Sequence, residues 1–555
     1  MLWQRLTMYK WRDLLTKVLA MILFVIANPD PGCAAVSSTG DVCCTGFFSI
    51  VGSTSLGQVT IDGGTQISGS GLRFGNSSAG VGIGVVTGYS SSWTTGFFLV
   101  GVLGTGQLQI LNGGTVYSAG DMIIGHETDS LGTIIVSGLG STLVAKELIN
   151  VGNLGSGVLR IEDGALVVHT ADTPMIEDFT VGTLGSLELS HGRLDSRLSL
   201  INHGTVTGNG RMEFAGTISN LPTGHIATEV GERLVLNGVV ENAGSISIDG
   251  GEIQFLKNVT NSGAGSEITL RGGGVARFPI TDFGFDSISG LLATTTGTND
   301  IYGTVRLQGA DSRISASGNS TATFHDPVTN EGGKIEVFAG STIVYLEGLT
   351  SIGSSAAVSI DLAAPEGTLE SARIDIGGAA QLSGTLEVGL ATDFQPSLGD
   401  TFQIMEAPGG ITGTLALASA PNLPDWMQWH LDIHPTSVVL SIVTTGDYNG
   451  SGAADAADYV GWRDALGSMT DLRANGDNNG ASAGLIDQAD YAMWKANFGN
   501  MAGAGSAAGA DLSTIADNAV PEPSTVVLAC LGIGGLFLSC LSQGCTATGG
   551  MLSSA

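Results

Sequence analysis

The chain is poor in positive charge. Its 555 residues include 21 lysines and arginines against 51 aspartates and glutamates, which gives a formal net charge of −30. Proteins that bind nucleic acid neutralise its phosphates with clusters of lysine and arginine, so this balance excludes a nucleic-acid partner. An acidic surface is instead typical of an exported, well-solvated protein and suits loops that bind calcium.

Cysteine is missing from the body of the chain. The six cysteines are Cys33, Cys43, Cys44, Cys530, Cys540 and Cys545, and none lies between Thr45 and Ala529. The body therefore has no disulfide and no thiolate metal site. Adjacent Cys43 and Cys44 would bridge each other only with strain, so we expect free thiols or pairing elsewhere.

Recognisable catalytic motifs are absent as well. There is no serine nucleophile elbow, no zinc-binding helix motif and no phosphate loop. Charge is densest in the stretch that contains Arg160, Glu162, Asp163, Asp172, Glu177, Asp178, Arg193, Asp195 and Arg197. Two carboxylates and an arginine on one groove would suit a polysaccharide lyase or glycosidase. The alternative is that these are solvent-facing turn residues, and fold analogy alone does not favour an enzyme.

Glycine is abundant, with 85 residues, and it recurs with a period. Apolar–glycine pairs start at Val51, Phe74, Val100, Ile124, Val151 and Val181, at intervals of 23 to 30 residues. Short alternating strands follow most of them, such as those around Val59/Ile61, Leu108/Ile110 and Leu159/Ile161. Each has one apolar face, which a single unit cannot bury but stacked copies can.

We therefore predict an all-β fold, a right-handed parallel β-helix (solenoid) in which each repeat makes about one coil. Regular repeats are expected over residues 46–203. Less regular ones are expected over 204–364, where Asn242-Ala-Gly, Asn261-Ser-Gly and Asn330-Glu-Gly accompany strand-like runs. A β-propeller or β-sandwich is the alternative, but it explains glycine-punctuated single strands less simply. The repeats resemble those of autotransporter passengers and other exported bacterial β-helices.

The last coil of a solenoid is an open edge that needs covering. We expect residues 365–443 to form a β cap of antiparallel strands with larger aromatic side chains. Trp426, Trp429, His430 and His434 fall in this segment. These residues could form a ligand site. Core packing and turn closure are the preferred interpretation, because they suit large aromatic side chains better.

Residues 1–35 have the pattern of a secretory signal peptide. Basic residues up to Lys17 precede the apolar stretch Val18–Ala27, and the small-residue site Cys33-Ala34-Ala35 follows. A membrane anchor is the alternative, but an apolar stretch this short does not span a bilayer.

Residues 520–541 contain Val520-Pro-Glu-Pro-Ser-Thr525 and then the apolar run Val526–Leu541. They resemble the PEP-CTERM sorting signal, which implies an exported Gram-negative protein and processing by an exosortase-like sorting protease. The usual basic cluster is missing, since no lysine or arginine follows Lys495. An unprocessed tail would be a C-terminal hydrophobic helix and a short membrane anchor. Residues 501–519 before it are predicted to be a flexible linker.

Residues 446–500 contain a duplicated loop and helix. In the first copy Asp447, Asn449, Ser451, Ala453, Asp455 and Asp458 take positions 1, 3, 5, 7, 9 and 12 of a calcium-binding loop, with glycine at position 6 for the sharp turn. Tyr459, Trp462 and Leu466 share one face of the following helix. The spacing predicts a calcium site, and the alternative is an ordinary solvated turn.

The second copy departs from this spacing. It offers Asp477, Asn479, Asp487 and Asp490, but position 12 is Gln488 and Asp490 lies two residues late. Either the loop bulges outward and Asp487 and Asp490 still reach a calcium ion, or the second site is impaired.

The pair resembles a type I dockerin domain, in the variant with an aromatic Tyr-x-x-Trp helix. The resemblance implies a small α-helical, EF-hand-like calcium module that docks onto a cohesin-like protein, often in polysaccharide-degrading systems. Ser451 stands where the family usually has aspartate, which suggests weaker calcium binding.

Together these features favour an exported protein at the cell surface, at the outer membrane or in the extracellular space. We expect a structural and adhesive role in an extracellular polysaccharide matrix, with no catalysis. One alternative is a secreted polysaccharide-active lyase or glycosidase that carries a dockerin. Another is a passive carrier whose only specific act is cohesin binding.

Overall fold

The computed structural model describes residues 36–45, 48–170, 178–281, 284–351, 353, 355–363, 371–424, 427–469, 474–476 and 484–501. The predicted signal peptide, nearly all of the linker and the PEP-CTERM-like segment lie outside these residues. The chain divides into two compact units, one with almost all of the strands and the other with the two helices. None of the helices in the described ranges is long and apolar enough to cross a membrane.

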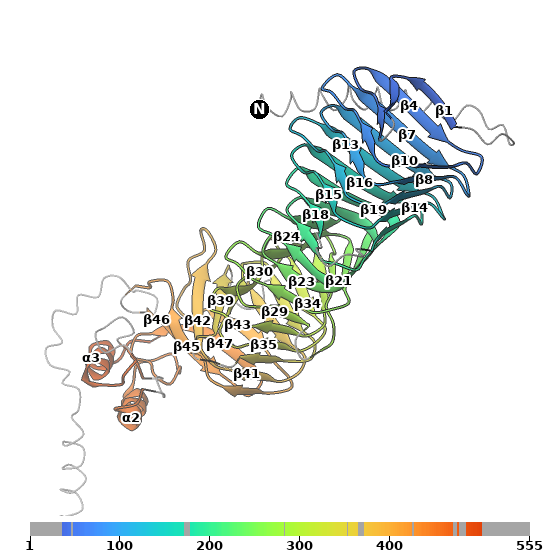
Figure 1. The fold of residues 1–555 in the computed structure, drawn as a ribbon. Helices are drawn as coiled ribbons and strands as arrows, with labels where there is room; N and C mark the ends of the chain where they lie inside the picture. The colour runs from blue at the N-terminus through green and yellow to red at the C-terminus, as the bar shows by residue number, and fades with distance from the viewer. Residues whose placement is uncertain are drawn as a thin grey trace, which may run out of the picture. The chain divides into compact units, whose positions relative to one another are not determined.

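The first unit is a parallel β-solenoid, as the repeats predict. Its strands stack in three columns, and a strand pairs in parallel with the strand one coil before it and one coil after it. Figure 1 shows part of the first column, with β4, β7, β10, β13 and β16 side by side in chain order. The fold is therefore built from sequence-adjacent coils, which excludes the propeller and the sandwich.

The first column contains β4 (Leu56–Ile61), β7 (Val81–Thr87), β10 (Thr105–Leu111), β13 (Leu131–Ser137), β16 (Ser156–Glu162), β22 (His225–Thr228), β24 (Ser245–Asp249), β27 (Glu267–Arg271), β30 (Gly290–Thr296), β33 (Ser312–Ala316), β36 (Lys334–Val337), β39 (Ala357–Leu362), β42 (Thr385–Leu390) and β45 (Ala416–Ser419). Buried and partly exposed residues alternate along these strands, as in β10 and β13. Alternation of this kind places every second side chain in the interior of the coil.

The second column contains β5 (Gln66–Gly69), β8 (Ser92–Thr95), β11 (Thr115–Ser118), β14 (Thr142–Ala145), β17 (Leu166–His169), β25 (Glu252–Phe255), β28 (Val275–Arg277), β31 (Thr298–Tyr302), β34 (Thr321–Phe324), β37 (Thr342–Tyr345), β40 (Arg373–Ile376) and β43 (Thr401–Glu406). Three long strands, β19 (Gly185–Ser196), β21 (Thr205–Asn220) and β23 (Arg233–Asn242), bend from one column into the next. Register shifts mark the corners of β19 and β21.

The third column contains β3 (Phe48–Val51), β6 (Leu72–Phe74), β9 (Phe98–Val100), β12 (Met122–Ile124), β15 (Ile149–Val151), β18 (Phe179–Val181), β20 (Leu200–Asn202), β26 (Val259–Asn261), β29 (Phe285–Ser287), β32 (Val305–Leu307), β35 (Val328–Asn330), β38 (Leu349–Ser351), β41 (Ala380–Leu382) and β44 (Ile411–Gly413). The six apolar–glycine pairs of the sequence end the first six of these strands, and their apolar residues are register partners from coil to coil. Each repeat is therefore one coil.

The same interior position holds asparagine in the coils that follow. Asn202, Asn220, Asn242 and Asn261 are register partners and are fully buried. Each Nδ2 donates to the Oδ1 of the next asparagine at 2.7 Å, from Asn202 through to Asn261. This asparagine ladder explains why the Asn-x-Gly signals continue the period after the apolar pairs stop.

The two ends of the solenoid differ from each other. At the N-terminal end, β1 (Val36–Gly40) pairs antiparallel with β4, and β2 (Val42–Thr45) pairs antiparallel with β3. These strands cover the first coil, and Cys43 on β2 is a free, exposed thiol. At the other end, β40 to β45 pair in parallel with the preceding coil, so the antiparallel cap predicted for residues 365–443 is wrong up to Ser419.

Four further elements complete the described chain: β46 (Met427–Ile433), β47 (Ser437–Thr444), α2 (Ala456–Ala465) and α3 (Gln488–Asn497). Trp429 on β46 is buried, which agrees with core packing, while Trp426 lies outside the described residues.

Candidate functional site

The two helices of the second unit begin in the same way. Asp455 is the N-cap of α2 and Asp487 is the N-cap of α3, and each side chain accepts a hydrogen bond from the backbone of the first turn. Asp458 and Asp490, three residues later, close a capping box with the N-cap backbone. These carboxylates satisfy N–H groups that a helix start leaves without partners.

Each helix is tied to the start of the other. The indole Nε1 of Trp462 donates to the backbone oxygen of Asp487 at 2.8 Å, and that of Trp494 donates to the backbone oxygen of Asp455 at 2.8 Å. The two bonds are equivalent, so the sequence duplication is also a duplication of contacts. A shift of either helix would break both of them.

The core of this pair is small and aromatic. Tyr448, Trp462, Ala465, Ala474, Ile486 and Trp494 are buried together, with Tyr459 and Tyr491 packed against them. Leu466, expected on the same helix face, is the C-cap of α2 and is 52 % exposed, so this part of the prediction is wrong. The chain leaves the helical direction at this residue, which turns its side chain outward.

The first loop brings together most of the oxygens that the sequence predicts, whereas the exposed Asp455 carboxylate caps α2. Asp447 is fully buried, and its carboxylate accepts hydrogen bonds from the N–H groups of Ser451 at 2.9 Å and Gly452 at 2.6 Å. The Ser451 Oγ lies 3.5 Å from Asp447 Oδ1 and 3.3 Å from the backbone oxygen of Ala453. The Asn449 Oδ1 accepts from the Ser451 N–H at 2.8 Å, which turns it into the same loop.

Asp458 connects this loop to the helix. Its Oδ1 accepts from the Asn449 N–H at 2.9 Å and its Oδ2 from the Asp455 N–H at 2.7 Å. Burial raises the pKa of Asp458, against the effect of these two hydrogen bonds, and the charges of Asp447 and Asp455 raise it further. Asp447 and Asp458 are buried like charges that repel each other, and a divalent cation would relieve this repulsion.

The second copy has the equivalent anchor. Asp490 is fully buried, and its carboxylate accepts from the Gly476 N–H at 2.6 Å and the Asp487 N–H at 2.7 Å. Asp490 therefore has the capping role of Asp458, but its loop partner Gly476 precedes Asp477, whereas the loop partner of Asp458, Asn449, follows Asp447. The predicted ligands Asp477 and Asn479 lie outside the described residues.

The first loop fits a calcium ion by the chemistry of its donors. Carboxylate, amide, hydroxyl and backbone oxygens within one turn are the hard ligands that calcium takes. Within the described ranges, no group of three or more His, Cys, Asp or Glu side chains converges on a metal position. The fit therefore rests on the neutral oxygens of Asn449, Ser451 and Ala453 as much as on the carboxylates.

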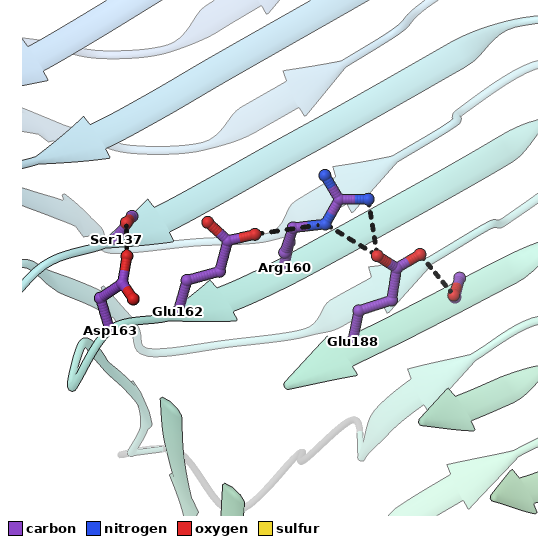
Figure 2. Close-up of polar contacts among 6 residues, drawn as sticks. Ser137, Arg160, Glu162, Asp163 and Glu188 are labelled. Atoms are coloured by element: carbon purple, nitrogen blue, oxygen red, sulfur yellow. Dashed lines mark hydrogen bonds and ion pairs between the residues drawn. The ribbon is translucent and has the colours of Figure 1, made fainter. Parts of the chain in front are cut away.

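The charged stretch of the solenoid is the other candidate. Figure 2 shows Arg160 between two carboxylates: its Nε lies 3.5 Å from Glu162 Oε1, and its Nη2 lies 2.6 Å from Glu188 Oε2 on the next coil. Asp163 points to a different neighbour and accepts from the Ser137 Oγ at 2.9 Å. Burial raises the pKa of Glu162, an effect that Arg160 opposes.

These contacts form an ion-pair ladder across coils. A separate set in the second column joins Arg193 to Asp195 at 2.7 Å and to Glu213 on the next coil at 3.1 Å. Asp178 accepts from the Ser199 N–H at 3.2 Å, and Asp172 and Glu177 lie outside the described residues. Around Arg160 the arginine charge is already shared by two carboxylates, which is the arrangement of a stabilised sheet face.

No protein-family model matches the chain, and no curated protein matches it either.

Proposed function

We propose that the chain is an exported structural protein in which a right-handed β-solenoid acts as a stiff support and the helical pair is a calcium-dependent docking module. The observation that carries the proposal is the first loop, where the side chains of Asp447 and Ser451 and the carbonyl of Ala453 lie within hydrogen-bonding distance inside one turn. Asp447, Asn449, Ser451, Ala453 and Asp458 would hold the ion. Bound calcium would supply a positive charge beside the two buried carboxylates of this loop, Asp447 and Asp458.

The rest of the proposal follows from the sequence. The dockerin-like duplication favours a cohesin-like protein as the docking partner, and the terminal segments favour export and sorting to the cell surface. The solenoid would present its repetitive faces to extracellular polysaccharide. Ion pairing of the carboxylates around Arg160 favours this supporting role over an enzyme.

Calcium is expected to stabilise the helical unit and to leave the solenoid unchanged. Calcium at about 100 times its Kd adds roughly 2.7 kcal/mol to the free energy of unfolding. For a unit of this size we expect its Tm to rise by about 10 °C or more. Differential scanning calorimetry of the whole protein, in calcium and in EDTA, measures this shift against the solenoid transition in the same sample.

The matched control is Asp447→Asn, which keeps the side-chain shape and removes one charge from the loop. It should lose most of the calcium-dependent shift, and its Tm in EDTA separately measures the loss of one of the two backbone hydrogen bonds that the carboxylate accepts. An equal shift in wild type and variant, or no shift at millimolar calcium, would remove the calcium module from the proposal.

A further inference from the structure

A cleft of about 420 Å³ opens on the solenoid where the long strands turn from one column to the next. Its walls are formed by Val168, His169, Thr170, Asp195, Ser196, Arg197, Glu213, Phe214, Ala215, Asn237 and Lys257. These residues come from β17, β19, β21 and β23 and from the turn after β25, so five successive coils contribute. The cleft therefore runs along the stacking direction of the coils.

The carboxylates in the cleft are already paired with arginines outside it. Asp195 Oδ1 is 2.7 Å from Arg193 Nε. Glu213 Oε1 is 2.5 Å from Arg211 Nε and 3.1 Å from Arg193 Nη2. Two arginines outside the cleft therefore balance the charge of these two acids.

The cations in the cleft have no such partners. Arg197 is exposed and Lys257 is partly exposed, and neither has an ion-pair partner among the residues that the structure describes. Among the described residues they are two positive charges outside any ion pair, in a chain whose net charge is −30. Three coil steps of about 4.8 Å separate their positions, so roughly 14 Å lies between them along the axis. An extended ligand that lies along the axis can contact both side chains.

His169 forms a neutral part of the wall. It is fully buried, its Nε2 lies 2.7 Å from the backbone oxygen of Glu147, and its Nδ1 lies 3.0 Å from Ser196 Oγ. A carbonyl only accepts, so Nε2 carries the proton and Nδ1 accepts from the serine hydroxyl. Burial lowers the pKa of His169, which keeps the ring uncharged. The positive charge of the cleft therefore comes from Arg197 and Lys257.

Two features favour a glycan over an acidic peptide. The strands of the lining pair with neighbours on both sides, so no free edge remains for a peptide strand to extend. The large apolar side chain of the lining, Phe214, is 2 % exposed and offers no pocket for peptide side chains. Thr170 and Asn237 instead present hydrogen-bonding groups of the kind that sugar hydroxyls use.

We propose that this cleft binds an extended anionic oligosaccharide along the axis of the solenoid. Arg197 and Lys257 pair with carboxylate or sulfate groups on different sugar units, and Thr170 and Asn237 bond to hydroxyls between them. The inference rests on the proposed role in an extracellular polysaccharide matrix and gives that role a site. It does not depend on calcium.

Isothermal titration calorimetry of the whole protein in EDTA tests the cleft, with tetragalacturonate as the carboxylate probe and a sulfated galactan tetrasaccharide as the sulfate probe. Neutral galactotetraose and a tetraglutamate peptide are the controls. We expect one or both anionic sugars to bind, with affinity that falls as salt rises from 20 to 200 mM. The combined variant Arg197→Gln/Lys257→Gln should bind at least tenfold more weakly.

The matched variant Arg313→Gln/Lys495→Gln removes the same charge from outside the cleft and should bind as wild type does. Unchanged circular dichroism shows that both variants fold. The proposal is overturned if no anionic sugar binds, if the neutral sugar or the peptide binds equally well, or if the two variants lose affinity alike. Because EDTA is present throughout, such a failure leaves the calcium module untouched, and loss of the calcium shift leaves the cleft untouched.

Discussion

Replacing Asn220 with leucine should destabilise the solenoid by about 3–5 kcal/mol, since it removes three hydrogen bonds from a buried polar network. The Nδ2 of Asn202 loses its acceptor, and the Oδ1 of Asn242 loses its donor. The backbone oxygen of Ser245 also loses the 3.1 Å bond from Asn220. Leucine fills a similar volume, so the effect reports the hydrogen bonds and not a cavity.

The control is Asn237→Leu, at a partly exposed position outside the ladder, for which we expect a change within about 0.5 kcal/mol. Denaturant unfolding followed by circular dichroism gives the global change. Hydrogen exchange over residues 200–261 shows whether the loss is local, because coils of a repeat protein open in units. Equal effects of the two substitutions would contradict the ladder.

Gly152→Ala should be almost as damaging. Gly152 has φ +78°, and a Cβ there would lie 2.3 Å from the backbone N and 2.4 Å from the Cα of Gly185 on the next coil. The left-handed conformation alone costs about 1–2 kcal/mol for alanine. The clash adds about 1–3 kcal/mol, because the backbone of a stacked coil cannot move aside without disturbing its neighbours.

Gly231→Ala separates these two effects. Gly231 has φ +79° but nothing within 4 Å of the added Cβ, so only the conformational cost of about 1–2 kcal/mol applies. The denaturation midpoints of the two variants give the difference. If Gly152→Ala is no worse than Gly231→Ala, the close approach of neighbouring coils is not what requires glycine.

The solenoid could be predicted because residues of the same type recur at the same position of successive coils, where they pack on one another. Val51, Phe74 and Val100 end equivalent strands, and the interval between them is the length of one coil. The third column then continues through Asn202 and Asn220. The change from apolar residues to asparagine at this position therefore did not end the period. A buried column accepts either apolar side chains or amides that bond to each other.

The orientation of the terminal strands could not be predicted in the same way. Alternation in a segment such as Leu386/Val388 shows which face is buried, but it is the same for parallel and antiparallel partners. The segment 373–419 continues the solenoid, whereas Val36–Gly40 covers the first coil as an antiparallel strand without a distinctive pattern.

For the candidate sites as well, the sequence pattern shows local spacing but not contacts between distant segments. Loop spacing identified Asp447 and Asp458, since ligands for one ion must lie on one short turn. Spacing could not show that Trp462 bonds to the backbone of Asp487, because that contact depends on how two helices pack. The sequence gives no signal for the cleft, because Arg197 and Lys257 are sixty residues apart and belong to no motif.

The most direct test of the account is the amount of calcium bound by the whole protein, measured by equilibrium dialysis and elemental analysis. We predict at least one calcium ion per chain in wild type and one fewer in Asp447→Asn. A wild-type protein that binds no calcium at millimolar concentration, or a variant that binds as much as wild type, would contradict the assignment of the duplicated loop and helix.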